Sequence, residues 1–201
     1  MQHNFSEDLF TSVEKANIVT TVESLLGDAD LSASLVYEKF LSTTFTASTQ
    51  EMTESWDRTL CNGVKGRFKY DEIVAGGGNI ELDDAFFIIP QSSLAVPQEK
   101  EDRILEWMYD AGTLNVTASS TSVVRYDATP DWDVAHAGDV LKIGSDYLDV
   151  KESAEATLTL LNVYSGSTAT NQGYELYRRW RIKRVEQDLL EIIWKFQARS
   201  I

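Results

Sequence analysis

The sequence is poor in the residues that most often carry out chemistry. Its 201 residues include one cysteine, Cys61, and two histidines, His3 and His136. A single cysteine excludes an intramolecular disulfide, and the histidines are too far apart for the short spacings typical of zinc sites. No Gly-x-Ser-x-Gly motif is present, which argues against a serine nucleophile of the α/β-hydrolase type. We therefore expect no enzymatic activity, no bound metal and no cofactor.

Basic residues are scarce relative to acidic ones. The chain has 18 Lys and Arg against 32 Asp and Glu, which gives a formal net charge of −14. Affinity for nucleic acid comes largely from Lys and Arg that neutralise phosphates, so we do not expect the chain to wrap DNA or to bind it sequence-specifically. The same charge is compatible with a surface past which DNA slides without adhering.

Long apolar runs are also absent. No stretch of about 18 apolar residues occurs, so we predict no membrane-spanning helix. Residues 1–8 contain neither a basic region nor an apolar core, so we expect no secretory signal. Together with the lone cysteine, these absences favour assembly in the cytoplasm.

Two acidic patterns begin like metal or catalytic sites but differ in detail. Residues 28–30 start like a calcium-binding loop, yet Ala33 replaces the required glycine and Lys39 replaces the bidentate glutamate. The carboxylates between residues 127 and 149 mostly neighbour Gly, Pro or Ser, where Asp side chains stabilise turns. We interpret them as turn residues, with an incidental cation or a glycosidase-type carboxylate pair as alternatives.

The periodicity of the N-terminal half predicts one helix followed by strands. Apolar residues recur every three or four positions between residues 7 and 26, where Ser6 can cap the helix and Gly27 can end it in the left-handed conformation. After Asp30 the period changes to two, which predicts strands separated by short turns. One of these turns, or a bulge, is predicted at 62–63 between strands at 53–59 and 63–70.

Turn residues that alternate with apolar residues predict a separate β-unit over residues 112–177. Its centre is the run 137–144, which contains Gly138-Asp139 and no catalytic group. We interpret 112–177 as a β-subdomain inserted in a small β-barrel or sandwich formed by 34–111 and 178–201. Residues 1–33 form an N-terminal helical segment, and the expected fold class is mainly β.

The last part of the chain leaves two interpretations open. Residues 180–199 predict either two strands joined by a turn at 186–188, or a helix over 184–198, which the intrinsic propensities favour. The basic run within it predicts a strand with one charged face. That face is either solvated or contacts an acidic neighbour, which could be another copy of the chain, and nucleic acid is a third option. The candidate subunit-contact residues are Arg178, Arg179, Arg181, Lys183 and Arg184.

A glycine run predicts a flexible loop in the first half of the chain. No Gly-Lys-Ser/Thr sequence follows Gly76-Gly77-Gly78, so the run does not match a phosphate-binding loop. Glycine permits alternative backbone states, so the loop over residues 70–79 is a candidate for movement. Its candidate functional residues are Asp71, Glu72, Gly76, Gly77 and Gly78.

The order of several short motifs resembles a known family. A Thr-rich strand, Val64-Lys65-Gly66, the glycine run, Asp83-Asp84 and the apolar strand 86–89 follow one another as in the head-tail joining proteins of tailed bacteriophages, of the head-closure or stopper type. The similarity covers about residues 34–107, although Glu101-Asp102 replaces the family's Gly-Asp turn. The last hairpin is also similar, and 112–177 resembles a β-module common in phage structural proteins.

The resemblance implies a structural virion protein of the phage neck. Such a protein forms a homo-oligomeric ring, a hexamer or a dodecamer, which joins the DNA-filled head to the tail. Its partners would be the portal or adaptor protein on one side, the tail terminator or tail tube on the other, and genomic DNA passing without sequence-specific binding. Residues 70–79 would face the tunnel as a gate, assembly would occur in the host cytoplasm, and no membrane is involved. The alternatives are a tail terminator or adaptor, or a carbohydrate-binding β-module that uses Trp107, Trp132 or Tyr147.

Overall fold

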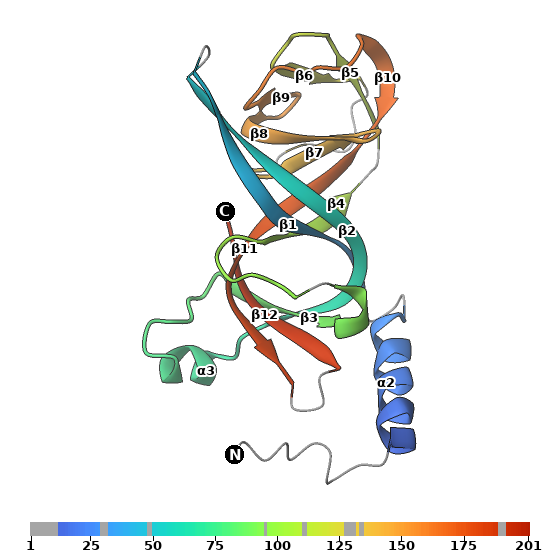
Figure 1. The fold of residues 1–201 in the computed structure, drawn as a ribbon. Coiled ribbons are helices and arrows are strands. Elements are labelled where there is room, and N and C mark those ends of the chain that lie inside the picture. The colour runs from blue at the N-terminus through green and yellow to red at the C-terminus, as the bar shows by residue number, and fades with distance from the viewer. Residues whose placement is uncertain are drawn as a thin grey trace. The chain divides into compact units, whose positions relative to one another are not determined.

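The computed structural model describes residues 12–28, 32–47, 50–94, 96–109, 112–126, 132, 135–188 and 192–201. The fold is mainly β and antiparallel, with a helix α2 (Ser12–Leu26) near its start, which confirms the predicted fold class (Figure 1). The chain divides into two compact units. The first comprises Met1–Ile104 and Arg181–Ser200, and the second comprises Leu105–Trp180 and Ile201. The predicted insert 112–177 lies within the second unit.

The first unit is built around a four-stranded antiparallel arrangement. Its strands follow the order β12-β3-β2-β1, with β4 beside β1 and β11 beside β12. Strands β4 and β11 also pair with each other, so the order returns on itself without forming an evenly closed barrel. The strands are β1 (Ala33–Thr46), β2 (Glu51–Arg67), β3 (Asp84–Pro90) and β12 (Ile193–Ser200), with the start of β4 (Arg103–Tyr109) and the end of β11 (Glu175–Gln187); the other residues of β4 and β11 belong to the second unit.

The C-terminal segment is a strand, so the helix considered over 184–198 is wrong. Burial along β12 alternates with period two: Trp194, Phe196 and Ala198 are buried and the residues between them are not. Phe196 pairs with Phe87 of β3, and both side chains are fully buried. These tertiary contacts outweigh the helical propensity of the segment.

Strand β2 is continuous, so the turn or bulge predicted at 62–63 is wrong. Asn62 and Gly63 lie in the paired part of the strand, opposite Ser34 and Ala33 of β1. A Cβ atom at Gly63 would lie 2.8 Å from the carbonyl oxygen of Ile88. The glycine therefore permits a close approach of neighbouring strands rather than a reversal of the chain.

Helix α2 confirms the predicted helix from Ser12 onward, and the proposed cap Ser6 lies outside the described residues. Leu26 is the one residue of the helix that is buried. Gly27 does not adopt a positive φ, so the predicted left-handed stop is wrong. Its N–H instead continues the helical pattern by donating to the carbonyl of Glu23 at 2.9 Å.

The second unit confirms the predicted turn-rich β-pattern. Gly138 and Gly144 have φ values of 94° and 60°, and they form the turns on either side of β7. Trp132 is fully buried and donates a hydrogen bond of 2.8 Å to the hydroxyl of Tyr174. The order is β10-β5-β6-β9-β8-β7-β11, where the new strands are β5 (Thr113–Val116), β6 (Ser122–Arg125), β7 (Val140–Ile143), β8 (Asp146–Ala154), β9 (Thr157–Leu160) and β10 (Ala169–Gly173).

The acidic residues of this unit include one that stabilises a turn. Asp139 is fully buried and accepts a hydrogen bond of 2.8 Å from the backbone N–H of His136, whose side chain is exposed as predicted. Asp127, Asp131 and Asp133 lie outside the described residues. Where the chain is described, no three His, Cys, Asp or Glu side chains are grouped to hold a metal, and no helix is long and apolar enough to cross a membrane.

Candidate functional site

The predicted glycine loop begins as a short helix. Strand β2 ends at Arg67 rather than continuing to residue 70, and α3 (Tyr70–Ala75) follows. The Glu72 carboxylate accepts a hydrogen bond of 2.7 Å from the backbone N–H of Lys69, which fixes the start of the helix. The side chains of Asp71 and Glu72 are exposed in its first turn, where negative charge is favourable.

The glycines after α3 reverse the chain. The N–H of Gly76 donates to the carbonyl of Glu72 at 2.9 Å and ends the helix. Gly77 and Gly78 have φ values of 58° and 90°, which side chains disfavour. A Cβ atom at Gly77 or Gly78 would meet nothing within 4 Å. Backbone conformation, rather than lack of space, therefore explains these two glycines.

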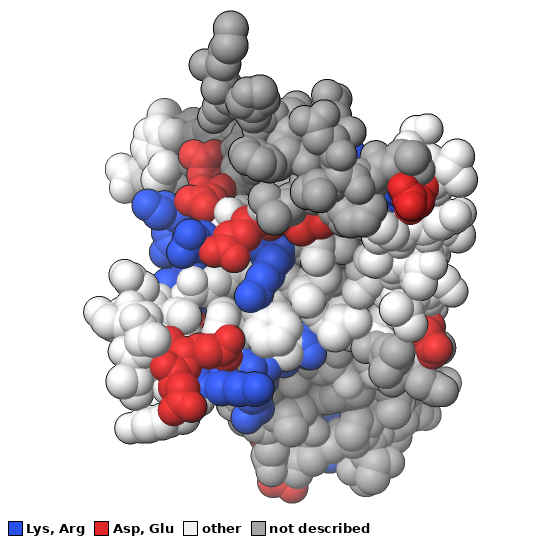
Figure 2. Space-filling view, turned by 90° about the horizontal axis from the view of Figure 1, so that it is seen from below, with Lys and Arg blue, Asp and Glu red and all other residues white. Residues whose placement is uncertain are grey.

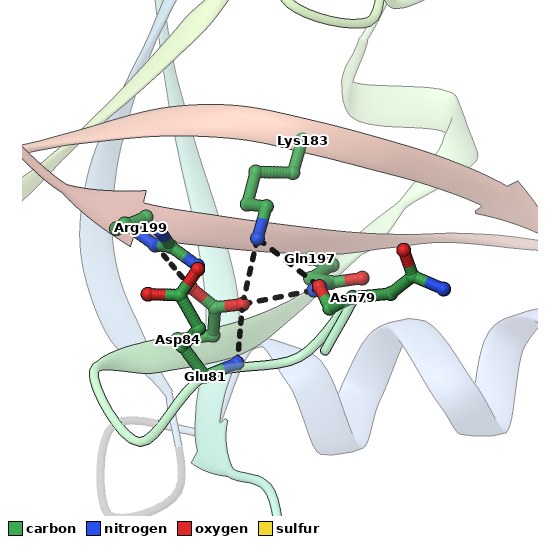
Figure 3. A network of polar contacts seen from close by, with 6 residues as sticks. All are labelled: Asn79, Glu81, Asp84, Lys183, Gln197 and Arg199. Atoms are coloured by element: carbon green, nitrogen blue, oxygen red, sulfur yellow. Dashed lines mark hydrogen bonds and ion pairs between the residues drawn. The ribbon is translucent and has the colours of Figure 1, made fainter. Parts of the chain in front are cut away.

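The far end of this loop is anchored at Asp84, the first residue of β3 (Figure 3). The Asp84 carboxylate is 2% exposed and accepts four hydrogen bonds. One oxygen accepts from Arg199 Nε at 2.7 Å. The other accepts from Lys183 Nζ at 3.1 Å, from Gln197 Nε2 at 2.9 Å and from the backbone N–H of Glu81 at 3.1 Å. The Asp84 anchor thus ties the loop to β11 and β12.

The same side chains also hold the loop backbone directly. The carbonyl of Asn79 accepts hydrogen bonds from Lys183 Nζ at 3.1 Å and from Gln197 Nε2 at 2.8 Å. Arg199 forms a second ion pair with Glu81 at 2.6 Å. Figure 3 shows these groups converging on Asp84 from the loop and from the two C-terminal strands. Residues 79–84 are therefore fixed, whereas the exposed Gly77-Gly78 turn lies beyond the anchor.

The hydrogen bonds of the anchor stabilise the charged form of Asp84. Burial alone would raise the pKa of this carboxyl group, but hydrogen bonds from Arg199, the Glu81 N–H, Gln197 and Lys183 outweigh burial. The pKa of Asp84 therefore lies well below its usual range. The hydrogen bond to Asp84 in turn raises the pKa of Arg199.

A small cavity lies beside the loop. Its volume is about 180 Å³, and its lining mixes acidic and basic side chains. Figure 2 likewise shows acidic and basic side chains next to each other on the face seen from below. The lining residues are Phe68, Glu72, Ile80, Arg184, Glu186, Lys195 and Gln197.

The basic run of β11 is a strand, as predicted, but its first members face internal partners. Arg178 Nε donates to Asp139 at 2.9 Å, and Arg179 forms an ion pair with Asp149. Arg179 is only 6% exposed. Both arginines therefore hold the second unit together.

The remaining members of the run differ in exposure. Lys183 belongs to the Asp84 anchor. Arg184 pairs with Glu186 at 3.1 Å, yet its side chain remains 66% exposed. Arg181 is exposed and forms no ion pair among the described residues. Arg181 and Arg184 are thus the exposed members of the run, and they lie on opposite faces of the strand because they are three residues apart. Trp180 and Ile182, which alternate with the basic residues, are buried.

Sequence reasoning missed the roles of two buried carboxylates. In the sequence, Asp84 stands out only as part of the Asp83-Asp84 motif. Asp102 stands out only because Glu101-Asp102 replaces the Gly-Asp turn of the family that the chain resembles. Asp102 is fully buried and accepts hydrogen bonds from the hydroxyl of Tyr37, from the N–H of Phe40 at 2.9 Å and from the N–H of Gln98 at 2.7 Å. In both cases the available signal was an acidic residue directly before, or at the start of, an apolar strand.

The carbohydrate-binding alternative loses one of its three aromatic residues. Trp132 is fully buried against Tyr174, at an interplanar angle of 84°. Trp107 is 44% exposed and Tyr147 is half-buried. A comparison with known proteins finds no matching family model and no matching curated protein.

Proposed function

We propose that this protein is a structural component of a bacteriophage neck, where it forms a ring that closes the DNA-filled head and receives the tail. The observation that supports this most directly is the anchored loop over residues 70–84. Its base is tied by the Asp84 anchor, while its acidic first turn and its Gly77-Gly78 turn are exposed. Such a loop can project into a tunnel while its base stays attached to the sheet.

The charge of the exposed loop suits a surface past which DNA moves. Asp71 and Glu72 are both exposed, and carboxylates repel phosphates rather than bind them. The positive φ values of Gly77 and Gly78 give this turn backbone states that other residues avoid. In the proposed ring the loop lines the tunnel as a gate, between a portal or adaptor protein and a tail terminator or tail tube.

Imaging of the purified chain tests the ring. We expect negative-stain micrographs to show closed rings of six or twelve copies, as the resemblance implies, with a central channel. Antibodies against the chain should label the neck of intact virions. Monomers or open filaments at concentrations at which other neck proteins assemble would contradict the proposal.

A reversible cross-link tests the gate. Glu72 of α3 and Lys195 of β12 line the same small cavity, so Glu72→Cys with Lys195→Cys is the pair to test, with thiol titration used to verify that oxidation forms the cross-link. We expect oxidised particles to retain their genome and reduced particles to release it. The native Cys61 is buried, and burial raises the pKa of its thiol to about 12, so it will not compete.

The matched control is the pair Glu72→Ser and Lys195→Ser, which makes the same truncations without a cross-link. If oxidised cysteine particles release DNA as fast as this control, the loop is not a gate. The ring itself would be unaffected by that result, because imaging tests it separately.

A further inference from the structure

Helix α2 is only shallowly packed on the first unit. It lies on the outside of the sheet, where it contacts β2 and β3 (Figure 1). Leu26, in its last turn, is its one buried residue. Ile18, Val19 and Val22 form a stripe at helical spacing, but each of them is only half-buried. Burial of apolar area is the main force that holds a helix against a sheet, so α2 is weakly held along most of its length.

The sequence of α2 does not make the helix stable by itself. It has 15 residues, and six of them are β-branched. Such side chains lose rotamer freedom in a helix, and isolated helices of this length are marginal in water. The hydroxyls of Thr20 and Thr21 donate to carbonyls four residues earlier in the same helix, at 3.0 and 2.8 Å, and do not tie it to the sheet. We therefore expect α2 to unwind when it leaves the sheet.

A cavity lies beside the last turn of α2. Its volume is about 550 Å³. Glu23 and Leu26 of the helix line it together with Cys61 of β2 and with Ser92 and Ser93 of the 3₁₀ turn η1 (Gln91–Ser93). Atoms that face an open space have no packing partners on that side. The cavity therefore removes packing contacts from the part of the helix that is otherwise the best attached.

A hydrogen bond fastens the helix beside this cavity. Ser92 Oγ of η1 donates to Glu23 Oε1 at 2.5 Å, and the contact is exposed to solvent. The net contribution of an exposed hydrogen bond is small, because water satisfies both groups when it breaks. The attachment of the last turn of α2 thus combines the burial of Leu26 with a contact that water can replace.

We infer that α2 is a lid that detaches from the first unit while the strands stay folded. Glu23 and Ser92 form its latch, and its opening uncovers the cavity and the side chain of Cys61, which is 7% exposed when the lid is closed. The strands have a core that does not need the helix, since Phe87 of β3 and Phe196 of β12 are paired and fully buried. The inference concerns a single copy of the chain and does not depend on the proposed ring.

Alkylation of Cys61 measures the opening. Cys61 is the one cysteine of the chain, so mass spectrometry follows a single addition of iodoacetamide. In the closed chain, burial raises the pKa of the thiol to about 12, so the reagent reacts through open molecules. We expect the rate to change less than about twofold between zero and about 1 M urea, because a local opening exposes little surface. A rate that rises with urea as steeply as global unfolding overturns the inference.

A matched pair of substitutions tests the latch. Ser92→Ala removes the hydrogen bond to Glu23 and should speed the alkylation of Cys61 about two- to tenfold. Ser93→Ala makes the same change at a neighbouring residue that also lines the cavity, and it should leave the rate unchanged. Equal acceleration by the two substitutions, or none by either, contradicts the inference.

A second pair tests the packing of the helix. Leu26→Ala removes its one buried side chain and should speed alkylation at least about tenfold. Leu25→Ala makes the same change where the side chain is 54% exposed, and it should have little effect. Hydrogen exchange gives a readout without Cys61, because the amides of α2 should share one opening free energy that is lower than that of β3 and β12. If the amides of α2 exchange only together with those of the strands, α2 is not a lid.

Discussion

Asp84 and Asp139 are both buried carboxylates with cationic partners, yet their pKa values move in opposite directions. Burial of Asp139 raises its pKa, and this effect outweighs the hydrogen bond from His136 and the charge of Arg178. For Asp84, burial is outweighed by its hydrogen bonds, of which that from Arg199 is the strongest, and its pKa falls. The balance between burial and the hydrogen bonds and charges around each carboxylate therefore sets the direction of its pKa shift.

These directions predict two separate effects of pH. Asp84 has a lowered pKa when folded, so it contributes stability above the pKa of an unfolded Asp and loses it only as the pH falls through the much lower folded value. Asp139 has a raised pKa, so its contribution is greatest below the unfolded value and is lost as the pH rises through the folded one. We expect carboxyl carbon shifts in an NMR titration to show Asp139 protonating first during acidification. Coincident titration of both groups would contradict this prediction.

Removal of the Asp84 carboxylate should destabilise the first unit. Asp84→Ala leaves Lys183 and Arg199 without their shared partner, and we expect a loss of about 2–4 kcal/mol in the free energy of unfolding. Urea denaturation measures this loss, and hydrogen exchange should quicken at Asn79 and Glu81. Asp83→Ala, at the exposed neighbouring position, is the control and should change stability by less than about 0.5 kcal/mol. Equal effects of the two substitutions would show that the anchor contributes little.

At the scale of elements, the close packing of neighbouring strands, rather than the geometry of a turn, explains why position 63 is a glycine. A Cβ atom there would lie 2.8 Å from Ile88 O and 2.9 Å from Leu35 Cδ1. We expect Gly63→Ala to cost about 1–3 kcal/mol in thermal or urea unfolding, because β2 must shift away from its neighbours. Gly173→Ala is the matched control in β10, since a Cβ atom would meet nothing within 4 Å there. A neutral Gly63→Ala would mean that the strands separate easily.

Local sequence patterns predicted some elements well and others poorly, for physical reasons. The turns at Gly138 and Gly144 were predictable because they depend on residues a few positions away. Strand β12 was ambiguous because its structure depends on pairing with β3, about 100 residues earlier. Helix α3 was missed because its start depends on one hydrogen bond from Lys69 to Glu72 rather than on periodicity.

At the scale of the whole molecule, composition indicated the mainly-β class but could not locate the candidate site. The glycine run identified the loop, because glycine adopts positive φ angles that other residues avoid, wherever the segment lies in the fold. The Asp84 anchor combines residues 79–84 with Lys183, Gln197 and Arg199, and no spacing in the sequence brings these together. Of the basic run, only the structure distinguishes the exposed Arg181 and Arg184 from members with internal roles.

This distinction gives a prediction for assembly. Arg181→Glu with Arg184→Glu should abolish rings at low salt while leaving the thermal unfolding of the chain nearly unchanged, because both side chains are exposed. Arg179→Glu should instead lower the unfolding temperature, since Arg179 is buried beside Asp149. Sedimentation and thermal melts measure the two effects. Unchanged rings in the double variant would remove the arginines from the subunit contact.

The pairing of β3 with β12 also sets the order of events during synthesis. Pro90 is paired with Ile193, so β3 must wait for about 100 further residues before its partner leaves the ribosome. At about 5–20 residues per second this delay is roughly 5–20 s. The second unit lies almost wholly within the intervening chain and can fold during that time. A chain that stops before residue 193 would leave β3 with an open edge, and we expect such nascent fragments to need a chaperone or to aggregate.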